Sequence, residues 1–318
     1  MRYQAFELHG HTHHSDGKMS PAQLCKEAVA QMLSGIAITD HNTAAAHLEE
    51  IGLQDIAVIQ GMEWTTFWGH LLVIGSCHEG RWLTASPDNM GHLLAELNSE
   101  GMAIGIAHPR DIAGVLRTGA NWEYPMPTWK DVHYMEIFSN FSPHLAYINK
   151  LAYEKWTVLL NSGYRLATTS GRDWHVPHSP GQHAAVTYLG IDGAISTATV
   201  VDALRSGRSY VTLGPCMNFA IRNMGTVYSI GDTIENGQYY LTFESFCNER
   251  HKLWKEFALE ISEYRLVHNG VISLASNKPI QSEVIRLSKG WARAELYGVA
   301  KWLQEPQLLA FTSPIYVL

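Results

Sequence analysis

Short apolar runs recur along the first two thirds of the chain, separated by polar loops and by segments with helical spacing. The clearest runs lie at residues 2–8, 35–39, 70–75 and 101–107. Strands that alternate with helices in this way are typical of parallel α/β folds. The regularity of the alternation favours a barrel, in which side chains at the C-terminal ends of the strands build the active site.

Two of the intervening segments carry helix start and stop signals. In residues 19–35, Ser20 is the expected N-cap, Pro21 occupies the first helical position and Gln23 completes a capping box. Residues 142–163 form a second expected helix, which opens on a Ser-Pro pair and closes near a glycine. Both helices follow a predicted strand, as a repeated strand–helix unit requires.

The pattern changes near Gly214 and Pro215. Segments such as 257–267 and 308–318 alternate or run apolar with little helical period, and the Asn269–Gly270 pair predicts a hairpin turn. These features indicate a β-sandwich. The expected domains are residues 1–214, which carry the barrel, and residues 215–318, which carry the sandwich.

Composition narrows the class of protein. The chain has 318 residues, of which 46% are hydrophobic and 17% charged, so it can bury a large core. The net charge of -7 argues against a bulk nucleic-acid partner. No apolar run approaches the ~20 residues that cross a bilayer, and the N-terminus lacks the features of a secretory signal, so we expect no membrane association and a cytoplasmic location. The four scattered cysteines are expected to be buried thiols.

Histidine is concentrated in the first part of the chain, where 15 of the 17 lie at or before His183. The stretch ELHGHTHHSDG at residues 7–17 begins at the end of a predicted strand. His9 and His11 alternate along that strand, so they share a face and can bind one cation. One such pair is weak support for a metal site. An acidic or imidazole group recurs, however, at the end of nearly every predicted strand, and this accumulation indicates a metal centre.

Six motifs within residues 5–190 resemble, in order, the metal-binding motifs of the PHP (polymerase and histidinol phosphatase) hydrolases. They read ELHGHTHHSDG, AITDHN, GMEW, GHLLVIG, IAHPR and TSGRDWH. The segments ALRSGRSYVTLGP and AFTSPIYVL further resemble the CehA/McbA-like branch, whose members carry a β-sandwich after the PHP domain and include hydrolases of aryl carbamates. The resemblance implies an α/β fold with a distorted (β/α)7 barrel, followed by a smaller C-terminal β-sandwich domain.

The resemblance also implies a trinuclear metal centre at the C-terminal face of the barrel. A mixed set of imidazoles and carboxylates suits divalent zinc, manganese or iron, so two or three such ions are the expected cofactors. Every ligand position of the pattern is filled in this chain. The implied ligands of the first, second and third metal are His9, His11, Glu63 and Asp173; Glu63, His70 and His108; and Asp16, His41 and His175.

Metals of this kind acidify a bridging water and polarise the bond that it attacks, so a hydrolase needs no nucleophilic serine or cysteine. Asp173 is a candidate catalytic residue because it would face the first metal. Arg110 and Arg172 lie where a guanidinium can clamp phosphate oxygens, although either can instead form an ordinary ion pair at the barrel rim. His144 follows a strand and is a candidate proton donor to the leaving group, or simply a histidine at a helix start.

We therefore expect an enzyme, and most directly a metal-dependent phosphoesterase that acts on a small phosphorylated molecule through a metal-bridging hydroxide. A carbamate or carboxylic ester hydrolase is the alternative, favoured by the branch resemblance and by the aromatic residues of the 122–129 segment. A third hypothesis is a non-catalytic PHP module whose metals only stabilise the fold. The partner is expected to be a small-molecule substrate, and the sequence leaves its identity, the metal and the oligomeric state open.

Overall fold

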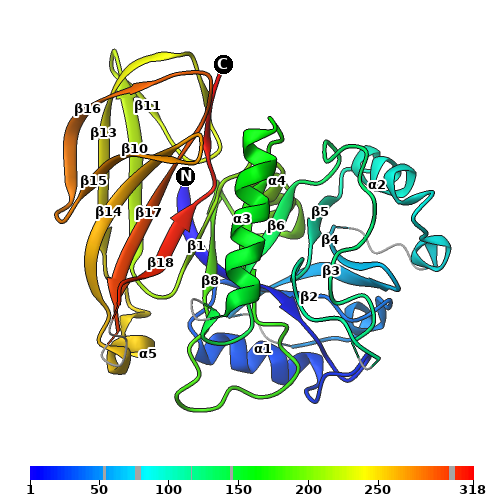
Figure 1. The fold of residues 1–318 in the computed structure, drawn as a ribbon. Helices are drawn as coiled ribbons and strands as arrows, with labels where there is room; N and C mark the ends of the chain where they lie inside the picture. Colours follow the sequence, from blue (N-terminus) through cyan, green and yellow to red (C-terminus); the bar gives the residue numbers. More distant parts are fainter. Residues whose placement is uncertain (53–54, 76–79, 116, 144–145, 301–304) are drawn as a thin grey trace.

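The computed structural model describes residues 1–318 except 53–54, 76–79, 116, 144–145 and 301–304. His144, the candidate proton donor, therefore lies outside the described residues. Figure 1 shows a mixed α/β part beside a part built mainly from strands. The strands of the first part are β1 (Arg2–Gly10), β2 (Gly35–Ile38), β3 (Ala57–Thr66), β4 (Gly69–Ile74), β5 (Ala103–Ile106), β6 (Tyr134–Ser139), β7 (Ala167–Gly171), β8 (Val186–Ile191) and β9 (Ser209–Thr212).

These strands form a curled sheet whose two ends approach each other. In the order β8-β1-β2-β3-β4-β5-β6-β7, neighbouring strands are hydrogen-bonded; β1, β2 and β3 are parallel, and so are β5, β6 and β7. The segment after β7 returns to the end of β1. There the His11 N–H donates to the Trp174 carbonyl at 3.0 Å, and the Trp174 N–H donates to the His9 carbonyl at 3.1 Å. This contact places the C-terminal ends of β1 and β7 side by side.

Strand β4 departs from the expected parallel arrangement and runs antiparallel to both β3 and β5. Only Phe67 and Trp68 separate β3 from β4. Two residues suffice for a hairpin, whereas a parallel pair needs a crossover of a dozen residues or more. Thr65 opposes His70 in the resulting register, so the start of β4 lies beside the C-terminal end of β3.

The capping box predicted for α1 (Pro21–Ala30) is confirmed. The Gln23 N–H donates to the Ser20 hydroxyl at 3.2 Å, and the Ser20 N–H donates to Gln23 Oε1 at 2.8 Å. Helix α3 (Tyr147–Asn161) begins later than expected, because Ser142 has a φ of 48°, outside the right-handed helical region. The other helices of this part are α2 (Met90–Ser99), α4 (Thr197–Arg205) and the 3₁₀ turns η1 (Ala45–Leu48) and η2 (Arg81–Thr84).

The C-terminal part is a sandwich of two sheets, as predicted. One sheet has the order β11-β10-β13-β16, and its inner face packs on β14 and β17, with the rings of Phe243 and Tyr264 5.2 Å apart. Asn269 and Gly270 both have positive φ and form the predicted turn between β14 and β15. The elements are β10 (Cys216–Asn223), β11 (Thr226–Tyr228), β12 (Thr233–Ile234), β13 (Gly237–Phe246), α5 (His251–Trp254), η4 (Lys255–Phe257), β14 (Glu260–His268), β15 (Val271–Ser276), β16 (Ile280–Leu287), β17 (Gly290–Val299), β18 (Gln307–Thr312) and β19 (Ile315–Val317).

The two parts are joined by a shared sheet and by α3. Strand β18 pairs antiparallel with β9, and β9 with β8, so one sheet runs from the barrel into the sandwich. Helix α3 stands between the two parts (Figure 1). Arg293 on β17 pairs with Glu295 at 2.8 Å, and its guanidinium lies over the rings of Tyr153 and Trp156 of α3, 4.4 and 4.5 Å from their centroids. Trp291 also donates from Nε1 to Asn161 Oδ1 at 2.9 Å.

Two further expectations concern thiols and membranes. Cys25 and Cys216 are buried free thiols, as predicted, whereas Cys247 is exposed. Among the described ranges, no helix combines the length and the apolar character that crossing a bilayer requires.

His133, just before β6, makes the stability of the fold depend on pH. Its Nδ1 accepts from the Ile104 N–H at 3.0 Å, and its Nε2 lies 3.2 Å from Asn98 Oδ1. Burial, assisted by the positive charge of Arg205, lowers the pKa of His133 from 6.5 to about 4. Between pH 6.5 and pH 4 the folded state thus binds fewer protons than the unfolded state. The contribution of neutral His133 to the free energy of unfolding is complete above pH 6.5 and is lost as the pH falls toward 4.

The variant His133→Gln keeps a hydrogen-bonding side chain but removes the titration. We expect the free energy of unfolding, measured by urea denaturation in EDTA, to fall less steeply in the variant than in the wild type between pH 6.5 and pH 4. Equal slopes would show that protonation of His133 is not coupled to unfolding.

Candidate metal centre

The first group of candidate ligands lies where β1, β3 and β7 end, and its members are nearly all fully buried. His9 Nε2 lies 3.3 Å from Glu63 Oε2 and 3.3 Å from Asp173 Oδ1. His11 Nε2 lies 3.4 and 3.1 Å from the same two oxygens. In the described part of the chain, none of these four atoms makes a well-aligned hydrogen bond, although His41 Nδ1 also lies 2.8 Å from Glu63 Oε2. Buried nitrogen and oxygen lone pairs that converge in this way are what a metal ion satisfies, so these residues fit the implied cation.

The second group uses the other oxygen of the same glutamate. Glu63 Oε1 lies 2.9 Å from His70 Nδ1 and 3.1 Å from His108 Nε2. The outer ring nitrogens of both histidines contact backbone carbonyls: His70 Nε2 lies 3.1 Å from Thr118 O, and His108 Nδ1 lies 3.0 Å from Ala120 O. Such contacts fix the ring orientation and the tautomer. Glu63 therefore faces both groups, as a bridging ligand would.

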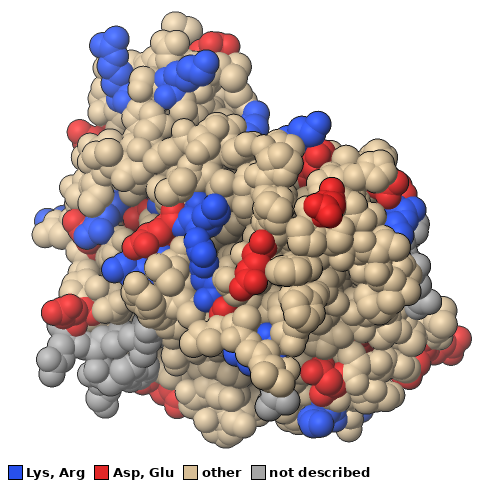
Figure 2. Space-filling view, turned by 45° about the vertical axis from the view of Figure 1, so that its right-hand side comes forward, with Lys and Arg blue, Asp and Glu red and all other residues tan. Residues whose placement is uncertain are grey.

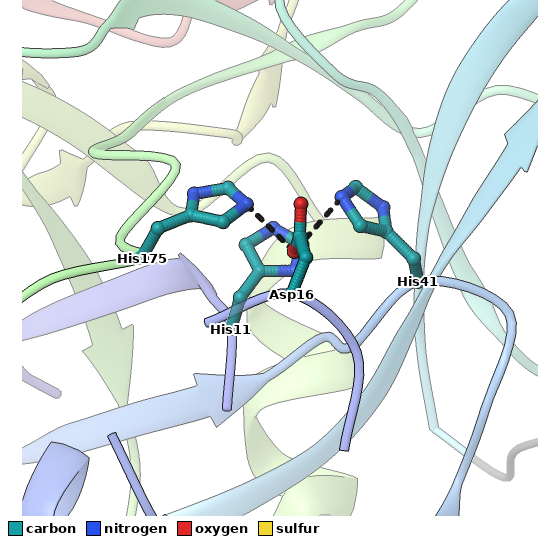
Figure 3. A group of neighbouring side chains, drawn as sticks. All are labelled: His11, Asp16, His41 and His175. Carbon is teal, nitrogen blue, oxygen red and sulfur yellow. Dashed lines mark ion pairs between the residues drawn. The ribbon is translucent and has the colours of Figure 1, made fainter. Parts of the chain in front are cut away.

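The third group lies at the mouth of the barrel, and its members Asp16, His41 and His175 are more exposed than the inner ligands. Figure 3 shows these three side chains together with His11. Asp16 Oδ1 lies 3.0 Å from His175 Nε2 and 3.5 Å from His41 Nε2. His11 joins this group, because its ring lies 4.2 Å from the ring of His175 and 4.3 Å from that of His41. The resemblance did not assign His11 to the third metal. All nine residues named as ligands are thus brought together, in groups that overlap at His11 and Glu63.

Two buried carboxylates outside these groups hold the candidate ligands in place. Glu136 Oε2 lies 2.9 Å from His9 Nδ1, so the opposite ring nitrogen, Nε2, faces the first group. Asp40 accepts from the Thr12 N–H at 2.7 Å and from the Ser15 hydroxyl at 2.6 Å, which fixes the loop that carries Asp16. No role was predicted for Asp40, although its position at the end of a buried strand, next to His41, was a usable signal.

The charges of the candidate ligands shift one another's pKa values. Burial alone would raise the pKa of Glu63, but the surrounding imidazoles, His9 first, lower it well below its usual range. Burial opposes protonation of His108, yet hydrogen bonding and attraction to Glu63 raise its pKa to about 9. Where no cation is bound, protons on the imidazoles supply the positive charge that the carboxylates require. Metal binding must therefore displace protons and become weaker at low pH.

The two arginines predicted to clamp phosphate lie elsewhere. Arg172 is only 2% exposed, and its Nε lies 3.0 Å from Glu7 Oε2, away from the mouth. The Asp173 side chain, whose backbone φ is 53°, faces the candidate ligands, whereas the Arg172 side chain points away from them to Glu7. Arg110 is exposed and lines a separate small cavity with Trp122, among other residues. Neither placement supports the predicted clamp.

A different arginine reaches the candidate ligands. They open into a cavity of about 370 Å³, which Arg117, Thr118 and Ala120 also line. Arg117 is held by the buried carboxylate of Asp111, with 3.2 Å between Nη1 and Oδ1. The sequence analysis passed over Arg117. Its position in the long loop after His108 was the available signal, because such loops commonly form the wall or the lid of a site.

A fourth group of possible ligands lies on the surface and was not predicted. His14 Nε2 lies 2.6 Å from Glu49 Oε1, and His13 Nε2 lies 3.8 Å from the same oxygen. Their exposure and their separate partner agree with a surface ion pair.

Comparisons with known proteins agree with this geometry. Residues 7–107 match the family model of the PHP domain. The fold is similar to the crystal structure of a two-domain protein from Bacteroides vulgatus ATCC 8482 that contains a predicted PHP-like metal-dependent phosphoesterase. The two chains are 16% identical, with a TM-score of 0.54 over 99% of this chain and 95% of the other. The prediction of an α/β barrel followed by a strand-rich C-terminal domain is thereby confirmed.

Two curated proteins match a shorter segment. The 5'-3' exoribonucleases Rnm of Salmonella typhimurium (strain LT2) and Escherichia coli (strain K12) are each 41% identical over 68 residues. The matched segment is 20% of this chain and 23% of those enzymes, so the chain matches less than a quarter of their length.

The position of Glu63 between two groups predicts unequal effects of two substitutions. Glu63→Gln removes a charge from both inner groups, whereas Asp16→Asn removes one only from the group at the mouth. We expect Glu63→Gln to lower the metal content, measured by plasma mass spectrometry of the purified protein, more than Asp16→Asn does. Undiminished metal in Glu63→Gln would contradict the bridging position, and circular dichroism provides the control for folding.

Proposed function

We propose that this protein is a metal-dependent phosphoesterase that hydrolyses a small phosphorylated molecule in the cavity that Arg117 lines. The observation that carries the proposal is the convergence of buried lone pairs of His9, His11, Glu63 and Asp173 beside a cation-lined cavity. Bound metal ions would satisfy the converging lone pairs, and the guanidinium of Arg117 beside them would bind an anionic group of the substrate.

The chain's own residues have distinct roles in this proposal. His9, His11, Glu63 and Asp173 hold the inner cation, and the remaining candidate ligands hold up to two more. Bound there, zinc, manganese or iron would acidify a water molecule and polarise the ester bond. Asp173 has its catalytic role as one of these ligands.

Binding of the substrate falls to the loop after His108. Asp111 holds the guanidinium of Arg117 by two nitrogen–oxygen contacts, so its orientation is restricted before a ligand arrives. A guanidinium presented in this way donates charge-assisted hydrogen bonds to phosphate oxygens. The cavity, about 370 Å³, falls in the range that takes a metabolite or a single nucleotide.

The comparisons support phosphorus as the electrophile. The exoribonucleases act on RNA, as their name states, and the similar two-domain protein contains a predicted PHP-like metal-dependent phosphoesterase. On the face shown in Figure 2, Lys and Arg side chains are dispersed among Asp and Glu. The net charge of -7 favours a small substrate over a long nucleic acid. A 5'-phosphorylated RNA oligonucleotide belongs in the substrate panel because of the 68-residue match.

The carbamate or carboxylic ester alternative depends on the resemblance to the CehA/McbA-like branch and on an apolar substrate wall. Trp122, Tyr124 and Trp129 line the separate cavity with Arg110. Among the residues described as lining the main cavity, none is aromatic apart from histidine. The lack of an aromatic wall in the main cavity favours a phosphoester substrate over a carbamate or carboxylic ester. The third hypothesis, a non-catalytic module, leaves the restricted orientation of Arg117 without a purpose.

We predict that Arg117→Met lowers kcat/KM for a phosphoester substrate by about 10- to 100-fold, because a charge-assisted hydrogen bond contributes about 1.5–3 kcal/mol. Metal content should not change. Arg110→Met is the matched control, and it should leave kcat/KM within about twofold of the wild type, because Arg110 lines the other cavity.

The measurement compares nitrophenyl phosphate and phosphodiester, carbamate and acetate esters, together with the RNA oligonucleotide, on metal-loaded protein. Faster hydrolysis of carbamate or acetate esters would reject the phosphoesterase in favour of the ester hydrolase. Loss of activity in Arg110→Met but not in Arg117→Met would show that the substrate binds in the cavity that Arg110 lines.

A further inference from the structure

A third cavity, distinct from the main cavity and from the one that Arg110 lines, lies behind the metal centre, between the barrel and the C-terminal part. It measures about 60 Å³. Its walls come from Gln31 at the end of α1, from the segment 172–184 that follows β7, and from residues 250–257 around α5. Figure 1 shows α1 and α5 at the same lower end of the molecule.

Two arginines, both more than nine-tenths buried, line this cavity. Arg172 is 2% exposed and Arg250 is 7% exposed. Arg172 pairs through Nε with Glu7, but its buried Nη1 has no hydrogen-bond partner in the described part of the chain. Arg250 donates from Nε to the Gln31 carbonyl at 3.1 Å and has no ion pair with any described carboxylate. Arg172 Nη1 is thus a buried donor without a described partner, and such a donor is costly unless a ligand satisfies it.

Neutral donors complete the lining. Trp254 is 6% exposed, and its Nε1–H finds no acceptor among the described residues. His178 and Gln182 contribute further polar atoms, and His178 Nδ1 is likewise without a described partner. The cavity thus presents donors from two separate parts of the fold.

The nearby carboxylates do not fill this role. Glu7 accepts from the backbone N–H groups of Leu8, His9 and Arg172, each at 3.1 Å, and these bonds hold it outside the cavity. Glu27 accepts from the His178 N–H at 3.2 Å. Neither glutamate lines the cavity, and its described walls contain no acidic side chain.

We propose that this cavity is a binding site for one small tetrahedral oxyanion, such as phosphate or sulfate, held by Arg172, Arg250 and Trp254. The volume equals that of about two water molecules, so it admits such an anion but no nucleotide. The bound anion joins α5 to the segment 172–184, which also carries Asp173 and His175. The site is separate from the metal centre and does not depend on the proposed catalytic activity.

Sulfate is the probe for the test, added to the metal-loaded full chain and followed by calorimetric titration and by thermal unfolding. We expect saturable binding that Arg250→Gln weakens by about tenfold or more, because a charge-assisted contact is lost. Trp254→Phe keeps the shape and removes one donor, so it should weaken binding by about two- to tenfold. Sulfate should raise the Tm of the wild type more than that of either variant.

Two controls separate this site from the others. Arg117→Met reports on sulfate in the metal-centre cavity, and the exposed Arg286→Gln reports on general loss of positive charge. Arg286→Gln should bind sulfate as the wild type does, and Arg117→Met should keep the binding event that Arg250→Gln and Trp254→Phe weaken, whether or not it loses sulfate from the metal-centre cavity. Binding that is lost in Arg117→Met but retained in Trp254→Phe would overturn the proposal, as would the absence of saturable binding to the wild type. If Arg250→Gln does not fold, Trp254→Phe alone decides the outcome.

Discussion

The convergence of imidazole and carboxylate atoms in a buried space is the constraint on which this structure depends. His9 and His11 each approach Glu63 and Asp173 at 3.1 to 3.4 Å. Removing such groups from water costs free energy unless positive charge is placed among them. The fold has to hold them in this arrangement whether or not a cation is present, and much of the barrel interior is organised to do so.

That organisation is a second layer of buried polar residues. Glu136 orients His9, Asp40 orients the loop that carries Asp16, and Glu7 accepts the backbone N–H groups on either side of the join between β1 and the segment after β7. Asp173 has a φ of 53°, a conformation unfavourable for a residue with a side chain. The pair of backbone hydrogen bonds between Trp174 and the end of β1 stabilises this conformation. The hydrogen bonds that close the barrel therefore also orient the candidate ligand Asp173.

Most of the elements were predictable from the sequence because they depend on local pattern, whereas the individual candidate ligands were named through the resemblance to the PHP motifs. Apolar runs fix the strands, and side chains at strand ends are brought together by any barrel. The antiparallel β4 was not expected, although the two-residue connection between Thr66 and Gly69 was sufficient to indicate a hairpin. The arginines could not be assigned in this way. Arg110, Arg172 and Arg117 all lie in or near ligand motifs in the sequence, but their directions depend on loop conformation. Arg172 contacts Glu7, which lies far away in the chain, and Arg117 contacts Asp111 within an irregular loop.

The pairing of β18 with β9 affects how the two parts of this protein can be separated. Residues 310–312, which close the sandwich sheet, are hydrogen-bonded to residues 210–212 of the barrel. A chain that ended at the junction would leave β9 as an open edge strand, with a row of unpaired amide and carbonyl groups beside the apolar surface that Phe311 now covers. Open edges of this kind recruit strands from other molecules and promote aggregation. The C-terminal part therefore acts as a built-in cover for the barrel, and the gain or loss of such a cover during evolution would require a new way of protecting the β9 edge.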